Sequence, residues 1–115
     1  MAYVDTFIAP VKEENREEYL KHAQEMWVLM KEFGALKTTE LWGDDIPPGE
    51  VTSFPFSVKL EAGEQVVVGI VEWASKEARD QGWEKMRTDE RMQGPMQFDG
   101  KRMIFGGFSQ IFTAN

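Results

Sequence analysis

Two segments of the chain are apolar on both faces of any strand that they could form, and this constrains the fold more than any other feature. The segment MIFGGF, residues 103–108, has no charged side chain, and QVVVGIVEW, residues 65–73, has one, Glu72. A strand with one face in water alternates apolar and polar residues instead. Both strands are therefore expected to be covered on both sides.

The remaining elements follow from periodicity and from turn residues. Residues 2–9 are rich in β-branched and aromatic types and are expected to form a strand that ends at Pro10. From Glu13 to Phe33, apolar residues recur at steps of three and four, which predicts a long helix that ends at Gly34. The other expected elements are a strand over 35–43, an extended edge segment over 51–59, a strand over 65–73, a helix over 76–87 capped by Ser75, and a last strand over 101–112.

This order of elements predicts an α+β, ferredoxin-like βαββαβ domain over residues 1–115, with a four-stranded antiparallel sheet and two helices on one face. Two helices cover only one face, so the other apolar face needs a partner. The simplest partner is a second copy of the sheet, which gives a homodimer in the form of a dimeric α/β barrel. Gly106 and Gly107 then mark a bulge or a close backbone approach, with a ligand pocket as the alternative.

Charge and cysteine content exclude several classes of function. The chain has 20 acidic and 13 basic residues and a formal net charge of −7, so binding to nucleic acid or to an anionic membrane is not expected. It has no cysteine, which excludes disulfides, thiolate nucleophiles and Cys-ligated metal centres. The start of the chain has no basic signal region and no apolar stretch is long enough to span a bilayer, so a cytoplasmic protein is expected.

Five stretches spread along the chain resemble one protein family. They are YVDTFIAPV at the start, MKEFGALKTTELWGDD at 30–45, EWASKEARD at 72–80, MRTDERM at 86–92 and FDGKRMIFGGF at 98–108. Together they are similar to the bacterial domain of unknown function 1428, and the resemblance covers nearly the whole chain. It implies a dimeric α/β barrel in a bacterial cytoplasm, in a superfamily that also holds cofactor-free monooxygenases, heme-degrading enzymes and isomerases. It implies no activity and transfers no catalytic residue.

Four titratable side chains are candidates for proton transfer. Asp5, Glu40 and Glu72 each lie in a strand that is otherwise poor in charge, and carboxylates on neighbouring strands could share a site and raise one another's pKa. Ion pairs with basic residues at the strand ends are the structural alternative. His22 is the only histidine and could be a general base, or an ordinary residue at the border of the apolar stripe of its helix.

Aromatic side chains are the candidates for ligand binding. The chain has four tryptophans, which is many for its length. Trp42, Trp73 and Phe105 could hold a planar ring, with Gly106 and Gly107 leaving it room. The alternative is that these aromatic side chains fill the core or a dimer interface.

The segment GDDIPPGEVTSFPF, residues 43–56, is long and has no regular periodicity. Loops of this length are usually functional or intermolecular, so it could close over a site as a lid or reach across to a partner subunit. Asp44, Asp45 and Glu50 could attract a divalent cation, but they lack the ordered spacing of a calcium loop. We therefore expect no metal site and no cofactor.

Two functions fit these observations, and the sequence leaves open whether the protein is an enzyme. The first is a small homodimer that binds or transforms an aromatic or enolisable metabolite without a cofactor, in a cavity between sheet and helices. The alternative is a non-catalytic dimer that binds a ligand or serves in stress or regulation. The fold class cannot separate them, because this architecture hosts many functions.

Overall fold

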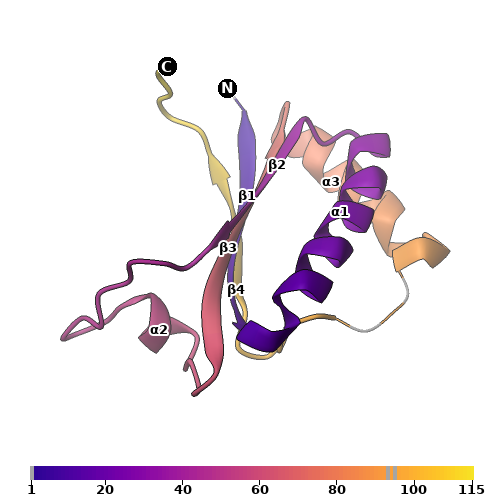
Figure 1. Ribbon diagram of the computed structural model, residues 1–115. Coiled ribbons are helices and arrows are strands. Elements are labelled where there is room, and N and C mark those ends of the chain that lie inside the picture. The colour runs from indigo at the N-terminus through magenta and orange to yellow at the C-terminus, as the bar shows by residue number, and fades with distance from the viewer. Residues whose placement is uncertain (1, 93, 95) are drawn as a thin grey trace.

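The structure, a computed structural model, describes residues 2–92, 94 and 96–115. Its four strands form one antiparallel sheet in the order β2-β3-β1-β4, and α1 and α3 lie together on one face of it (Figure 1). The elements are β1 (Tyr3–Lys12), α1 (Arg16–Glu32), β2 (Lys37–Trp42), α2 (Phe54–Ser57), β3 (Glu64–Trp73), α3 (Lys76–Arg87) and β4 (Ile104–Ser109), with short 3-10 turns at Glu13–Asn15 and Glu90–Met92. This confirms the predicted α+β, ferredoxin-like fold.

The strand register assigns each side chain to one of the two faces. β1 and β3 pair antiparallel from Tyr3 opposite Trp73 to Lys12 opposite Glu64, so odd-numbered residues of both strands share one face. That face lies under the helices, because Ala9 and Val67 pack there in one cluster with Tyr19 of α1. The even-numbered residues of β1 and β3 lie on the opposite face, away from α1 and α3 (Figure 1).

Both long helices are found where the sequence predicts them, α3 with the predicted bounds and α1 starting three residues later than predicted. α1 carries Glu17 and Glu18 in its first turn, and Gly34, with a φ of 113°, follows its C-terminal cap. The predicted start at residue 13 is a 3-10 turn that leads into α1. α3 begins after Ser75, whose Oγ accepts a hydrogen bond from the amide of Ala78 at 3.0 Å. The cap satisfies one of the free amides at the start of the helix.

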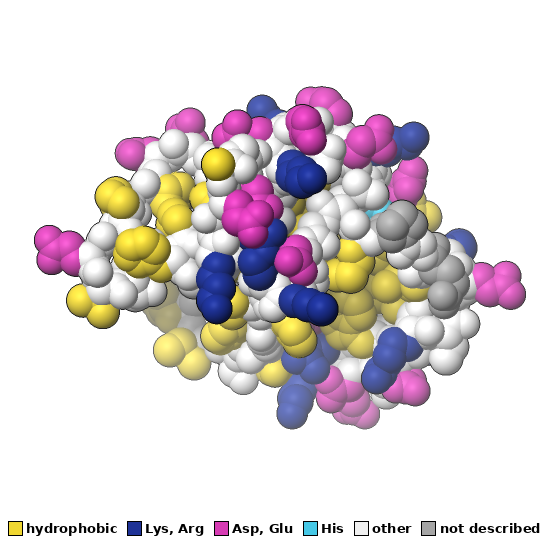
Figure 2. Space-filling view, turned by 90° about the horizontal axis from the view of Figure 1, so that it is seen from below, with side chains coloured by type: hydrophobic (Ala, Val, Ile, Leu, Met, Phe, Trp, Pro, Cys, Tyr) yellow, Lys and Arg dark blue, Asp and Glu magenta, His cyan; other side chains and the backbone are white. Residues whose placement is uncertain are grey.

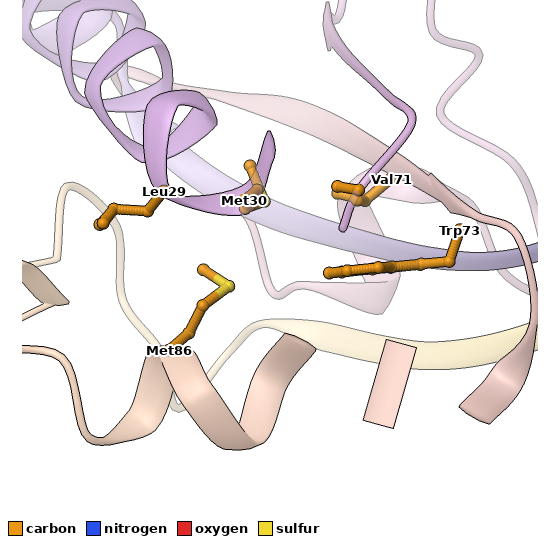
Figure 3. Close-up of a cluster of buried hydrophobic side chains, with 6 residues drawn as sticks. Leu29, Met30, Val71, Trp73 and Met86 are labelled. Atoms are coloured by element: carbon orange, nitrogen blue, oxygen red, sulfur yellow. The ribbon is translucent and has the colours of Figure 1, made fainter. Parts of the chain in front are cut away.

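Two apolar clusters join the helices to the sheet. The larger one lies between α1, α3 and β3, where Figure 3 shows the side chains converging: Leu29, Met30, Val71, Trp73 and Met86. Gly82 lets α3 approach closely there, because a Cβ at this position would lie 2.5 Å from the Trp73 ring. The smaller cluster lies under the start of α1 and comprises Ala9, Val11, Tyr19 and Val67, with Phe7, Trp42, Phe98 and Met103 around it.

Pro10 does not end the first strand, contrary to the prediction. β1 continues to Lys12, and Pro10 lies opposite Val66 in the register with β3. The pairing of β1 with β4 stops at Ile8, opposite Ile104. On that side β1 is therefore an edge strand at residue 10, where a missing backbone N–H costs no ladder hydrogen bond.

The segment expected to be extended over 51–59 contains a helical turn instead. Ser53 caps α2, because its Oγ accepts from the amide of Phe56 at 3.1 Å, and Pro55 suits the first turn of a helix. We call residues 43–63, between β2 and β3, the arm. The arm and α2 lie on the side of the sheet opposite α1 and α3 (Figure 1).

The last strand is shorter than predicted and contains no bulge. β4 covers Ile104–Ser109 rather than residues 101–112, and its register with β1 runs without interruption through Gly106 and Gly107. The expected close approach is confirmed at Gly107, where a Cβ would overlap the guanidinium of Arg79 and the hydroxyl of Tyr3. No helix in the described part of the chain has the length and apolar character needed to cross a membrane.

The face of the sheet opposite α1 and α3, here called the helix-free face, is mainly apolar. One row across all four strands consists of Leu41, Val68, Ile8 and Ile104. Leu41 and Ile104 are exposed, and so is Phe108 further along β4. Among the described residues, the register places four charged side chains on this face. Lys37 and Glu72, whose Nζ and Oε2 are 4.0 Å apart, lie at one end, and Lys12 and Glu64 lie opposite each other at the other end of the β1–β3 pairing. Their charges cancel, so this face is close to neutral on a chain of net charge −7.

Candidate functional site

Glu40 and Tyr19 form a partly buried hydrogen-bonded pair between the sheet and α1. β2 places Glu40 on the helix side, opposite Gly69 of β3, and α1 places Tyr19 above it. The Tyr19 hydroxyl donates a hydrogen bond to Oε1 of Glu40. Tyr19 is only 6% exposed, so the pair lies largely out of water. Within the described residues, Tyr19 is the only hydrogen-bond donor to the Glu40 side chain.

Aromatic rings surround this pair on the side of β1. The Phe98 ring lies 5.9 Å from that of Phe7 and 6.3 Å from that of Tyr19, measured between centroids. Phe7 lies across Gly69, since a Cβ at residue 69 would overlap its ring. The absence of a side chain at residue 69 thus lets an aromatic ring lie next to Glu40 in the sheet. The carboxylate therefore has an apolar environment on this side.

This environment changes the acid–base properties of both groups. Burial raises the pKa of Glu40 above its ordinary value of 4.5, and the hydrogen bond from Tyr19 lowers it by a smaller amount. Burial, followed by the nearby charge of Glu40, raises the pKa of the Tyr19 hydroxyl well above its ordinary value of 10.0. Tyr19 therefore stays protonated as a donor, while Glu40 is a stronger base than a carboxylate in water.

The exposed border of this region carries Trp42 and Arg16. The Arg16 guanidinium lies over the Trp42 ring, 5.3 Å from its centroid. Two residues before Glu40 on the same face of β2, the hydroxyl of Thr38 is buried without a hydrogen-bond partner among the described residues. A nearby hollow of about 200 Å³ is lined by Pro10, Lys12, Asn15, Glu64, Met96, Gln97 and Phe98. Through Phe98 this hollow adjoins the aromatic rings beside Glu40.

Asp5 lies on the same face of the sheet but in a different environment. Its Oδ2 accepts hydrogen bonds from the indole nitrogens of Trp73, at 3.0 Å, and Trp83, at 2.7 Å. Its Oδ1 accepts from Nε of Arg79 at 3.0 Å. Both oxygens of this carboxylate are thus engaged by groups from β3 and α3. The arrangement connects α3 to the two central strands.

Gly107 completes the surroundings of Arg79. The Arg79 guanidinium lies 4.9 Å from the centroid of the Tyr3 ring, and its Nη2 is 3.5 Å from the Tyr3 hydroxyl. Gly107 lies opposite Asp5 in the register, directly below this contact. The space left by this glycine is therefore filled by side chains of the protein itself.

The structure keeps the predicted proton-transfer residues apart. Asp5 and Glu40 share the helix side but lie on strands separated by β3, in different rows of the register. Glu72 lies on the helix-free face beside Lys37. His22 lies on α1 at a separate hollow of about 540 Å³, which it lines together with residues such as Met26 and Arg91.

The predicted ligand-binding residues are also dispersed. Trp42 borders the Glu40 region, whereas Trp73 is fully buried in the larger cluster. Phe105 is on the helix side of the edge strand β4 and is 74% exposed. Gly106 is on the helix-free face, and a Cβ there would make an ordinary contact of 3.7 Å with the Phe108 ring.

Sequence reasoning missed Tyr19 as a site residue. It lies in the apolar stripe of α1 and is expected there as a core residue. The available indication is chemical, because a buried tyrosine hydroxyl generally needs a hydrogen-bond partner. Among the described residues, no group of three or more His, Asp or Glu side chains is placed to hold a metal ion. The arrangement around Glu40 thus offers acid–base chemistry through a carboxylate and a phenol.

The fold and this pair of residues define a ferredoxin-like α+β protein with a partly buried carboxylate between sheet and helix. Residues 2–100 match the model of the family described as "Protein of unknown function (DUF1428)", and the chain belongs to that family. It is 46% identical over 114 residues to the "Uncharacterized protein YbaA" of Escherichia coli and to that of Shigella flexneri, with 96% of this chain and 97% of each relative covered. These matches confirm the resemblance found in the sequence.

A solved structure from Bacillus cereus shares the fold. That protein, provisionally named an antibiotic biosynthesis monooxygenase, superimposes with a TM-score of 0.59 over 99% of this chain and 97% of its own. The two sequences are 16% identical. At this identity the likeness establishes the architecture alone, and any shared activity has to be argued from the residues of this chain.

Proposed function

We propose that this protein is a cytoplasmic bacterial homodimer that binds a small aromatic or enolisable metabolite and transfers a proton to and from it through Glu40, without a cofactor. The observation that carries this proposal is the partly buried Glu40 carboxylate, held by one neutral donor, Tyr19, and bordered by aromatic rings. A carboxylate with a raised pKa is suited to accept a proton from carbon near neutral pH.

The chemical step needs only the residues at this site. Glu40 would take a proton from the carbon next to a carbonyl group, and the electron pair of the broken C–H bond would move onto the carbonyl oxygen as an enolate. Return of a proton to the same or another atom of the enolate gives exchange or isomerisation. The free hydroxyl of Thr38 could donate to a ligand oxygen, and Trp42 could pack against a planar ring.

The homodimer is supported by the helix-free face. A row of four apolar side chains crosses every strand there, and exposed apolar patches of this kind are rare on soluble monomers. Lys37 and Glu72 lie side by side on the same face, so a two-fold axis could place each next to its opposite charge in the partner. A sheet packed on a sheet would bury the row and form a dimeric barrel.

The test of proton transfer is hydrogen exchange in D₂O, followed by proton NMR on a panel of small aryl ketones and 2-oxo acids. We expect protein-dependent loss of the signal from the hydrogen next to the carbonyl for at least one class of compound. The Glu40→Gln variant should abolish it. In Tyr19→Phe the midpoint of the pH profile should move up, because Tyr19 lowers the pKa of Glu40. Exchange that persists unchanged in Glu40→Gln would refute the proposed role.

The alternative, a dimer that binds a ligand without chemistry, is favoured by one observation. The Glu40 carboxylate already accepts a hydrogen bond from Tyr19, as a structural carboxylate would. The two functions separate in a thermal-shift screen run on the same compounds. A saturable shift without any hydrogen exchange would support the binding function, whereas a shift accompanied by exchange supports proton transfer.

A further inference from the structure

The arm presents its apolar side chains on the same side of the sheet as the helix-free face. Val51 is 95% exposed, Phe54 46% and Phe56 54%. In Figure 1 the arm extends away from the sheet on the side opposite α1 and α3. Figure 2 shows hydrophobic side chains gathered at its left, where the arm lies. Two phenylalanines and a valine in water are costly unless another surface covers them.

Hydrogen bonds within residues 53–60 hold this part of the arm in a defined conformation. Ser53 caps its helical turn, the Ser57 hydroxyl donates to the carbonyl of Phe54 at 2.7 Å, and the amide of Leu60 donates to the carbonyl of Pro55 at 3.0 Å. Val58 is fully buried and so anchors the arm to the rest of the protein. Phe54 and Phe56 are therefore held in place on a capped turn while they remain exposed.

The area of the helix-free face indicates what covers these rings. The part of the sheet where all four strands run side by side is about six residues long, because β2 and β4 each pair over six residues. At a strand spacing of about 4.8 Å and a rise of about 3.3 Å it covers roughly 400 Å² in projection. A stable interface of standard size buries about 800 Å² per partner. In projection this part of the sheet is thus smaller than an interface of standard size. The arm is the apolar surface on this side that can supply the rest.

We propose that the two arms clasp the dimer, so that Phe54 and Phe56 of each protomer pack against the partner protomer. This inference rests on the proposed homodimer. Two facing sheets lie about 10 Å apart, so an element that projects from the face of one sheet necessarily runs alongside the other. A two-fold axis repeats the contact, so each dimer contains it twice. The arm then contacts both subunits, and its two aromatic rings are the residues expected to contribute most to the interface.

The contact between the arm and the partner protomer can be tested with one introduced cysteine, because the natural chain has none that would also be labelled. Phe56→Cys gives a single thiol, to which benzophenone maleimide is attached. Equal amounts of ¹⁴N and ¹⁵N protein are unfolded, mixed, refolded and irradiated, and the cross-linked peptides are identified by mass spectrometry. We expect cross-links that join a ¹⁴N peptide to a ¹⁵N peptide at about half of the events. Cross-links confined to peptides of one isotope would show that the arm folds back on its own chain and would overturn the inference.

The matched control places the same probe on an exposed apolar residue of α1. Val28 is 62% exposed, and α1 lies on the other side of the sheet from the arm. Val28→Cys with the same label should give no mixed-isotope cross-links. Mixed cross-links of equal yield from position 28 would mean that random collisions explain those from position 56, and the inference would fall.

Affinity provides the second measurement. The double variant Phe54→Ser, Phe56→Ser should weaken dimerisation at least about 30-fold in sedimentation equilibrium, since buried aromatic anchors typically contribute this much. The control double variant Leu20→Ser, Val28→Ser, two exposed apolar residues of α1, should change it less than about threefold. Circular dichroism verifies that each variant is folded. An unchanged dimer in the arm variant would overturn the inference.

One further variant separates this inference from the proposed homodimer. Leu41→Glu places a charge in the apolar row of the helix-free face, on the edge strand β2, and should give folded monomers. If Leu41→Glu is monomeric while the arm variant dimerises as the natural chain does, the sheets pair without the arms and only this inference fails. If the natural chain itself sediments at 13.2 kDa, both fail together.

Discussion

Two carboxylates on the same face of one sheet, Asp5 and Glu40, differ in how completely the protein satisfies them. Asp5 accepts from two indole nitrogens and from an arginine, so both of its oxygens are engaged. Glu40 accepts from one neutral phenol and is otherwise bordered by aromatic and apolar groups. In the second arrangement burial opposes the charged form and raises the pKa of Glu40.

The difference separates a structural group from a group that is available for chemistry. A carboxylate with three donors stabilises the packing of α3 on the sheet, and a ligand would have to break those bonds to reach it. A carboxylate whose proton affinity is raised by burial exchanges a proton more readily at neutral pH. The composition of a strand does not reveal this, because Asp5 and Glu40 look alike in the sequence.

The largest effect is expected when the acceptor is removed from the Asp5 cluster. Asp5→Ala leaves the indole nitrogens of Trp73 and Trp83 and the guanidinium of Arg79 without this acceptor. The free energy of unfolding should fall by about 3 kcal/mol, measured in urea by tryptophan fluorescence. Asp5→Asn is the control, because it keeps one acceptor oxygen in the same shape and should lose less. A loss below about 1 kcal/mol in Asp5→Ala would contradict the structural role.

The next largest effect is expected at Gly69, beside Glu40. In Gly69→Ala the new Cβ would overlap the Phe7 ring, so the ring has to move toward Phe98 and the free energy of unfolding should fall by about 2 kcal/mol. The matched experiment is a double-mutant cycle with Phe7→Leu, which removes part of the ring. The cost of Gly69→Ala should shrink in that background. Strictly additive costs would mean that the two residues do not compete for space.

The elements of this fold that the sequence predicts well are those with local causes. α3 begins at its predicted residue because Ser75 caps it and apolar residues face one side. The arm was predicted less well, since Pro55 between two phenylalanines suggests an extended edge, whereas Ser53 two residues earlier can cap a helical turn. The two alternatives depend on whether the serine faces the backbone, and composition does not determine that.

The candidate site could not be predicted as a pair for a different reason. Tyr19 and Glu40 are 21 residues apart, on a helix and on a strand, and each has an ordinary explanation on its own. Only the position of α1 over β2, together with the register that puts Glu40 opposite Gly69, brings them together. The same register keeps Glu72 away from this site. Successive residues of a strand point to opposite faces, so Glu72 lies on the helix-free face although its neighbour Val71 lies on the helix side.

A smaller effect is expected at Gly107, which allows the close approach beside the Asp5 cluster. The Cβ of Gly107→Ala would displace the flexible end of Arg79, and the free energy of unfolding should fall by about 1 kcal/mol. The adjacent Gly106→Ala is the control, because its Cβ meets only the Phe108 ring at 3.7 Å. Equal changes in the two variants would show that the strand responds to any side chain here, and that the contact with Arg79 has no part in it.

The smallest change in stability is expected at Glu40, and its size depends on pH. Because burial raises the pKa of Glu40 in the folded state, the folded state holds the proton more tightly than the unfolded state does. The resulting stabilisation is complete below the ordinary pKa of 4.5 and is lost as pH rises through the higher, folded value. Glu40→Gln cannot ionise, so it should gain in stability relative to the natural chain between pH 4 and pH 8 in urea unfolding.

The matching substitution at Asp5 is the control for Glu40→Gln. Asp5→Asn, which also removes one charge, should lose stability relative to the natural chain at pH 8, because its carboxylate is held by an arginine and two indoles. The two isosteric substitutions are thus expected to act in opposite directions at the same pH. If Glu40→Gln also destabilises the protein at pH 8 by as much as Asp5→Asn, Glu40 is a structural carboxylate of the same kind, and the proton-transfer proposal loses its physical basis.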